Sequence, residues 1–66
     1  MELTVNGERR EIPAGTGLPA LLELLGLRRG TVVIELNGTA LMPSEVAGTA
    51  LCGGDRIELV RAVAGG

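Results

Sequence analysis

One segment of this chain carries its apolar residues at helical spacing, and this single stripe limits the folds that the rest can adopt. Residues 18, 21, 22 and 25 are all leucine, so they line one face of a helix. Proline at position 19 fits a first helical turn, and Gly26 is a natural C-terminal stop. We therefore expect one main helix, about two to three turns long.

The segments on either side of this stripe alternate with the period of a strand. At the start, Met1, Leu3 and Val5 fall on one face, and Asn6-Gly7 is a strong hairpin signal before a polar return strand expected at a sheet edge. At the end, Ile57 and Leu59 point one way and Glu58 and Val60 the other. The expected strands are residues 1–5, 8–12, 31–36, 40–42 and 56–63, with a single helical turn at residues 44–46. Asn37-Gly38 is a second turn signal, between the third and fourth of these strands.

This order predicts a small α+β domain in which a mixed sheet, roughly four to five strands wide, carries the main helix on one face. The first and last strands are expected to pair in parallel in the middle of the sheet, with the helix as part of the crossover. No repeat or linker interrupts the chain, so we expect a single domain over residues 1–66 that ends in a flexible tail at residues 64–66.

The composition of the chain argues against several classes of function. The chain has 66 residues, a net charge of −2 and no aromatic residue, and arginine is its only basic residue. The acidic balance argues against a nucleic-acid partner, which needs a basic face. The N-terminal residues have neither a basic segment nor a long apolar run, so we expect no signal peptide and no membrane span. Cys52 is the only cysteine, which suits a reducing, cytoplasmic location.

No residue is suited to catalysis by itself. The sequence has no His, Lys or Tyr for general acid–base chemistry, and Cys52 has no His to activate it. We expect Cys52 to be a small, partly buried residue at a strand–turn junction, with a redox thiol as the lesser alternative. The glycines match no phosphate-binding motif, and the eight carboxylates are scattered, so we expect no bound cofactor and no metal site.

The C-terminal residues are different, because Gly65 and Gly66 have no side chains. A thin, extended tail can enter a narrow channel and place its carboxylate in the active site of another protein. Activation with ATP to an acyl adenylate supplies a leaving group that sulfur can displace to give a thiocarboxylate. Gly66 is then the attachment point, with Gly65 and Ala64 in the partner's active-site channel. The alternative is a frayed terminus that happens to end in glycine.

Four stretches match, in order, the segments of one known family. They are Met1–Gly7, then Ala14-Gly15 with Leu18 and Leu21–Glu23, then Glu35–Gly38, and finally Gly54–Glu58 followed by Val63–Gly66. This pattern resembles the ThiS family, the sulfur carriers of thiamine thiazole synthesis, which have the ubiquitin-like β-grasp fold. The resemblance runs from end to end without large gaps.

The resemblance implies a carrier rather than an enzyme. An E1-like, ThiF-like adenylyltransferase would use ATP to adenylate Gly66, and a persulfide relay would supply sulfur. The thiocarboxylate would then donate sulfur to a ThiG-like thiazole synthase. Beside the tail, Val60, Arg61, Ala62 and Val63 are expected to be partly exposed and to form a candidate docking surface. Ordinary scattered surface residues are the alternative.

Two positions depart from the family pattern. Gly17 stands where many relatives have a threonine able to cap the helix, so we expect a weaker cap, with Thr16 as a substitute. Gly53 replaces a common aspartate in the final turn. Neither residue is part of the tail, so both bear on stability more than on function.

Other functions stay open at this point. The small-subunit sulfur carrier of molybdopterin synthase has a similar fold and tail, although such chains are usually longer and have aromatic core residues. A ubiquitin-like modifier or interaction module is a third possibility, and the absence of lysine excludes lysine-linked self-chains only. An internal domain, in which Gly66 is not the true end, would remove the carrier mechanism.

Overall fold

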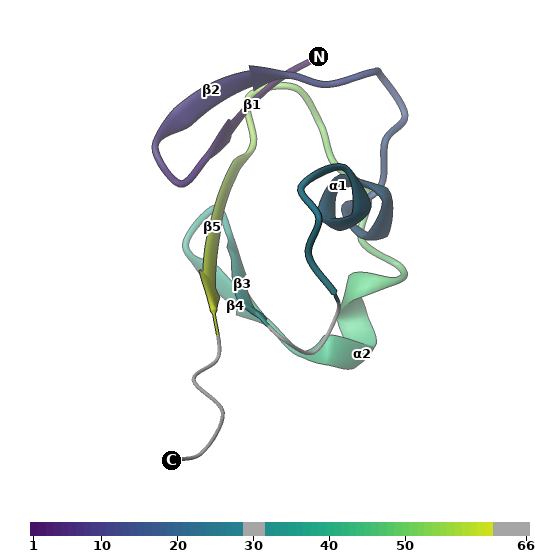
Figure 1. Ribbon diagram of the computed structural model, residues 1–66, viewed down its shortest axis with the longest axis vertical. Coiled ribbons are helices and arrows are strands. Elements are labelled where there is room, and N and C mark those ends of the chain that lie inside the picture. Colours follow the sequence, from purple (N-terminus) through teal and green to yellow (C-terminus); the bar gives the residue numbers. More distant parts are fainter. Residues whose placement is uncertain (29–31, 62–66) are drawn as a thin grey trace.

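The computed structural model describes residues 1–28 and 32–61, which form a five-stranded sheet with a helix across one face (Figure 1). This architecture confirms the predicted α+β fold. In chain order the elements are β1 (Glu2–Val5), β2 (Glu8–Glu11), α1 (Leu18–Leu24), β3 (Val32–Leu36), β4 (Thr39–Leu41), α2 (Pro43–Val46) and β5 (Arg56–Arg61).

The strand order β2-β1-β5-β3-β4 places the first and last strands side by side in the middle of the sheet. β1 and β5 run parallel, with Thr4 opposite Arg56 and Val5 opposite Ile57. The other neighbouring strands are antiparallel. The predicted parallel pairing is therefore confirmed, and so is the edge position of β2, whose four side chains are all exposed.

A layer of aliphatic side chains joins the sheet to α1. Leu18, Leu21 and Leu22 of the predicted stripe are at most 1% exposed, whereas Leu25 is only partly buried at the margin. Each such buried side chain contributes about 1.5–3 kcal/mol, and no aromatic ring shares this role. The buried cluster consists of Leu3, Val5, Ile12, Leu18, Leu21, Leu22, Ile34, Val46, Leu51 and Ile57.

The backbone hydrogen-bonding groups at the two ends of α1 are treated differently. At the C-terminus, Gly26 has φ +73°, its N–H donates to Glu23 O at 3.0 Å, and Leu27 N–H donates to Leu22 O at 2.8 Å. These two bonds are the pattern of a glycine-terminated helix, so the predicted stop is confirmed. At the N-terminus, Gly17 occupies the capping position without a side-chain hydrogen bond.

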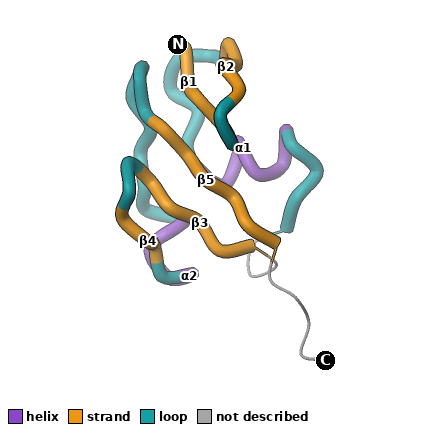
Figure 2. The backbone as a smooth tube through the Cα atoms, turned by 90° about the vertical axis from the view of Figure 1, so that its left-hand side faces the viewer, coloured by secondary structure: helices purple, strands orange, loops and turns teal. Residues whose placement is uncertain are grey.

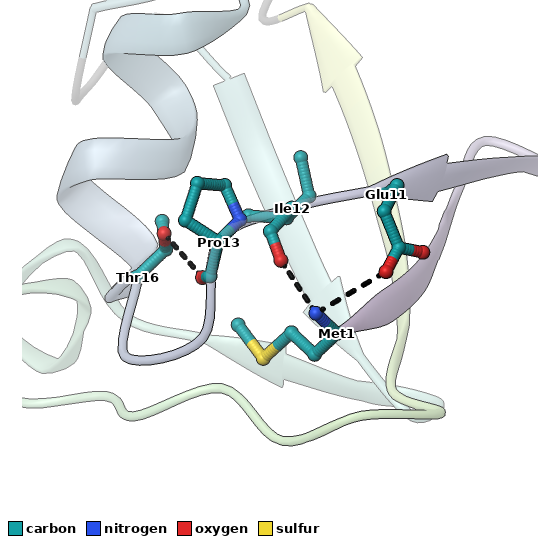
Figure 3. A network of polar contacts seen from close by, with 5 residues as sticks. All are labelled: Met1, Glu11, Ile12, Pro13 and Thr16. Atoms are coloured by element: carbon teal, nitrogen blue, oxygen red, sulfur yellow. Dashed lines mark hydrogen bonds and ion pairs between the residues drawn. The ribbon is translucent and has the colours of Figure 1, made fainter.

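The expectation that Thr16 substitutes as the cap is wrong. Its hydroxyl donates instead to Pro13 O at 2.7 Å and so closes the loop before the helix (Figure 3). In the same region the Met1 amino group donates to Ile12 O at 2.6 Å and lies 3.6 Å from Glu11 Oε1 (Figure 3). These contacts extend the β1–β2 hairpin by one residue and hold Ile12 over the core.

The expected partial burial of Cys52 is also wrong, because its side chain is exposed. Leu51, one residue earlier, takes the buried position, and Cys52 begins a tight turn in which its N–H donates to Asp55 Oδ2 at 2.8 Å. Gly54 in this turn has φ +90°, a conformation that favours glycine. Cys52 is thus a surface residue at a turn.

Substitution of Gly17 by serine is expected to stabilise the domain. Gly17 lies at φ −85° and ψ 171°, and a Cβ there would meet Pro19 Cδ at 3.7 Å and Thr49 O at 3.8 Å, which are ordinary contacts. The hydroxyl can accept the N–H of Ala20, because Pro19 has none. We expect a gain of about 0.5–1 kcal/mol, measured as a rise of roughly 2–8 °C in the midpoint of thermal unfolding.

The matched control is Gly26→Ser at the other end of α1. The positive φ of Gly26 makes any side chain there unfavourable, so this variant should lose about 1 kcal/mol. An unchanged or lower midpoint for Gly17→Ser would show that the start of α1 gains nothing from a side-chain cap.

Candidate functional site

The candidate site begins where β5 ends. Arg61 is the last described residue of this strand, and it pairs with Val32 of β3. Val60 and Arg61 are both exposed, as predicted, but as neighbours in a strand they point to opposite faces of the sheet. The other predicted site residues lie outside the described part of the chain, namely Ala62, Val63, Ala64, Gly65 and Gly66.

The outer face of the sheet, opposite α1, carries an apolar pair that the sequence analysis missed. Val60 of β5 lies directly opposite Val33 of β3, and the two side chains are 61% and 50% exposed. β5 lies between β1 and β3 (Figure 2), but this pair lies near the end of β5, beyond the last residue pair that β1 makes with it, Val5 and Ile57. Only the strand register reveals the partnership, because Val33 and Val60 are far apart in the sequence.

The two neighbours of β5 pair with it over different lengths. β3 pairs with β5 as far as Arg61, whereas β1 pairs with it only as far as Ile57. Beyond that point Asn6 continues the contact. Its N–H donates to Ile57 O at 2.9 Å, and its side-chain Oδ1 accepts the N–H of Leu59 at 2.7 Å. The amide side chain therefore takes the place of one more backbone carbonyl in the parallel ladder.

The start of β5 is fixed by a second asparagine. Asn37 Oδ1 accepts the N–H of Arg56 at 2.9 Å, and Asn37 Nδ2 donates to Asp55 Oδ1 at 3.0 Å. The same Asp55 carboxylate accepts Cys52 N–H, so the turn before β5 and the turn after β3 form one network. Both asparagines also have positive φ, 50° at Asn6 and 52° at Asn37, in the turns that the sequence predicted.

Sequence analysis identified these asparagines as turn residues and missed their bonds to β5. The available signal is the residue type, because asparagine both tolerates positive φ and offers a side-chain carbonyl. The two side chains therefore hold β5 at its first residue, Arg56, and at Leu59, two residues before its end.

The remaining surface offers little for chemistry. A cavity of about 90 Å³ is lined by apolar residues of β3, β4 and α2, and a second of about 250 Å³ lies along α1 and the residues that follow it. Within residues 1–28 and 32–61, no group of three or more His, Cys, Asp or Glu side chains is placed to hold a metal ion. No helix of these residues is long and apolar enough to cross a membrane.

The sheet order with its parallel central pair, and α1 packed across one face, define a β-grasp domain of the ubiquitin-like class. A family model extends this assignment to the sequence itself. The ThiS family model matches residues 3–66, and the chain belongs to this family. The resemblance stated from the sequence is therefore confirmed.

Two solved structures support the assignment. The crystal structure of a thiamine biosynthesis protein (ThiS) from Geobacter metallireducens is 30% identical, superposes with a TM-score of 0.84, and the match covers 100% of both chains. The NMR structure of a thiamine biosynthesis protein from the same organism gives a TM-score of 0.79 at 30% identity and covers 100% of this chain and 88% of that one.

A longer protein also contains a similar region. A thiazole synthase from Paramagnetospirillum magneticum is 36% identical over 66 residues, which are 100% of this chain and 20% of that protein. This chain thus spans about a fifth of the length of the curated relative that it matches.

Loss of the Asn6 side chain is expected to loosen β5 next to the tail. The variant Asn6→Gly keeps the positive φ but removes the acceptor for Leu59 N–H, so it should cost about 1 kcal/mol of stability. Amide hydrogen exchange should show the change first at Leu59.

The matched control is Asn6→Asp, which retains an oxygen at the same position and should protect the Leu59 amide nearly as well as asparagine does. Equal exchange rates at Leu59 in Asn6→Gly and the unmodified protein would contradict the anchoring role.

Proposed function

We propose that this protein is a sulfur carrier for thiamine thiazole biosynthesis, a co-substrate of partner enzymes that has no catalytic activity of its own. The observation that carries the proposal is the ThiS family match over residues 3–66, which includes the Gly65-Gly66 end. One relative, solved both by crystallography and by NMR, is named as a thiamine biosynthesis protein, and a curated relative is named as a thiazole synthase. These names favour thiazole over molybdopterin as the destination of the sulfur.

The chemistry that we propose takes place at Gly66, and it requires a free carboxylate there. A carboxylate oxygen attacks the α-phosphorus of ATP in a ThiF-like adenylyltransferase, and pyrophosphate leaves. The terminal sulfur of a partner's cysteine persulfide then displaces AMP. Cleavage of the resulting S–S bond by a partner thiol leaves the thiocarboxylate on Gly66 and a disulfide on the partner.

The body of the domain would serve as the handle for this chemistry. Its sequence has no His, Lys or Tyr, and in our proposal the acid–base groups come from the partners. The side chains of Asn6 and Asn37 hold β5, the strand that precedes the tail in the sequence. We propose that Gly65 and Ala64 enter the partner's channel, and that Val60, Arg61, Ala62 and Val63 contact the channel's rim.

A ThiG-like thiazole synthase is the proposed acceptor of the sulfur. The curated relative is a much longer protein, so its own activity is not assigned to this chain, and only the partnership is proposed. ATP is used by the activating partner and is not a bound cofactor of this domain. A cytoplasmic location stays a prediction.

Intact-mass measurement tests the proposal directly. Incubation with a ThiF-like adenylyltransferase, ATP and a persulfide donor should convert the protein to a species with one sulfur in place of one oxygen. Fragmentation should place this change on Gly66. Omission of ATP should abolish it, because a free carboxylate is a poor acyl donor.

Two variants probe the tail itself. Deletion of Gly66 and the substitution Gly65→Val should each lower conversion at least about 100-fold, because the reacting carboxylate is then misplaced in the active site. The substitution Glu23→Gln on the exposed face of α1 is the control and should leave conversion unchanged. Full conversion of the shortened chain would sink the proposal.

A further inference from the structure

The outer face of the sheet next to the end of β5 combines two cross-strand pairs of different character. The Val33–Val60 pair is apolar, and the adjacent pair consists of Glu35 and Glu58. All four side chains are exposed, and we call them the β3–β5 patch. We propose that this patch docks a partner protein that presents an arginine side chain beside an apolar contact.

The acidic pair is a repulsion that the free domain leaves in place. Glu35 and Glu58 are direct cross-strand partners, so their Cβ atoms lie about 4.5–5.5 Å apart, and like charges in this relation are destabilising. Within residues 1–28 and 32–61, the recorded ion pairs join Met1 to Glu11 and Arg10 to Glu8. Neither carboxylate of the patch is among them.

A second acidic pair in the same sheet shows the contrast. Glu2 and Glu11 are also direct partners, on β1 and β2. There the Met1 amino group lies 3.6 Å from Glu11 Oε1, so the fold supplies a counter-charge. At Glu35 and Glu58 no described group lies within 4.0 Å to do so, and Arg56, two residues before Glu58 on the same face, forms no ion pair with either carboxylate. A partner's cation could therefore still pair with them.

The apolar pair gives the patch a second, independent reason to be covered. Val33 and Val60 are two of the four large apolar side chains that the described residues expose. The other two are Leu24 on α1 and Met42 before α2, which lie apart from each other. The two valines, in contrast, are direct cross-strand partners on β3 and β5. Covering adjacent valines removes continuous apolar surface from water.

The chemistry of the patch selects its occupant. A metal ion needs more ligands, and no cluster of three or more suitable side chains exists in the described part of the chain. A second copy bound through the same face would bring four carboxylates together, and nucleic acid would be repelled likewise. An arginine satisfies both features, because its planar fork bonds carboxylates and its aliphatic stem packs on apolar residues.

The position of the patch connects it to the tail, and in this respect the inference rests on the proposed function. Val60 lies one residue before the end of β5, so a protein that receives the tail must approach this end of the sheet. The ThiF-like adenylyltransferase is therefore the partner against which the patch is best tested.

The central test is the double variant Glu35→Gln, Glu58→Gln. Removal of the repulsion should raise the midpoint of thermal unfolding of the free domain by about 1–5 °C. The same change should raise the Kd for a purified ThiF-like adenylyltransferase about 10-fold at low salt, as measured by titration calorimetry. Added salt should weaken binding of the unmodified protein to the adenylyltransferase more than binding of the variant. Salt screens the electrostatic attraction, which the variant has already lost.

Two further variants separate the contributions. Glu2→Gln removes one charge of the acidic pair that the fold already compensates, and it should leave the Kd unchanged. Val60→Thr keeps the β-branched shape and the preference for a strand but replaces a methyl group with a hydroxyl. It should raise the Kd roughly 5-fold and change the midpoint of thermal unfolding little.

The outcomes distinguish this inference from the proposed function. If Gly66 of the unmodified protein gains sulfur while the double variant binds as tightly as the unmodified protein at low salt, the patch is not the docking surface and the carrier function stands. If the unmodified protein is not adenylated at all, the proposed function fails and this inference fails with it. A Glu2→Gln effect as large as that of the double variant would also overturn the inference, since it would reflect net charge alone.

Discussion

The parallel contact between β1 and β5 is the interaction on which the rest of the structure depends. It comprises two residue pairs, extended by Thr4 N–H to Asp55 O at 3.0 Å and by Asn6 to Ile57 and Leu59. Asn6 and Leu59 are 53 residues apart, so nearly the whole chain must be enclosed to form it. Burial of Leu3, Val5 and Ile57 offsets this entropic cost of closing the chain. These side chains of β1 and β5 belong to the same buried cluster as the leucines of α1.

This arrangement makes the strand that leads to the tail the most supported strand of the sheet. β5 has neighbours on both sides, and each of the two asparagine turns adds a side-chain bond to it. These bonds hold the backbone of β5 up to Leu59, the residue before Val60 of the patch. Backbone that is already held has less conformational entropy to lose when a partner covers it, which favours the β3–β5 patch as a recognition surface.

The features that follow from chain-wide patterns could be predicted from the sequence. The leucine stripe predicted α1, and the order of alternating segments predicted the central parallel pair. Features set by the direction of one side chain could not be predicted. The Thr16 hydroxyl bonds Pro13 O instead of capping α1, and Leu51 takes the buried position beside Cys52. The alternation predicted that Glu58 and Val60 share a face, but their partners Glu35 and Val33 emerge only from the strand register.

The parallel direction of β1 and β5 has a further consequence. It places Met1 beside the start of β5, at the opposite end of the sheet from Arg61 (Figure 1). The Met1 nitrogen is engaged by Ile12 O and Glu11, and the sequence contains no lysine. The acyl adenylate that we propose at Gly66 would therefore meet no lysine amine on its own domain, and the Met1 amine is already engaged by two oxygens. Under the proposed mechanism, such a body would leave the activated glycine to the sulfur nucleophile that a partner brings.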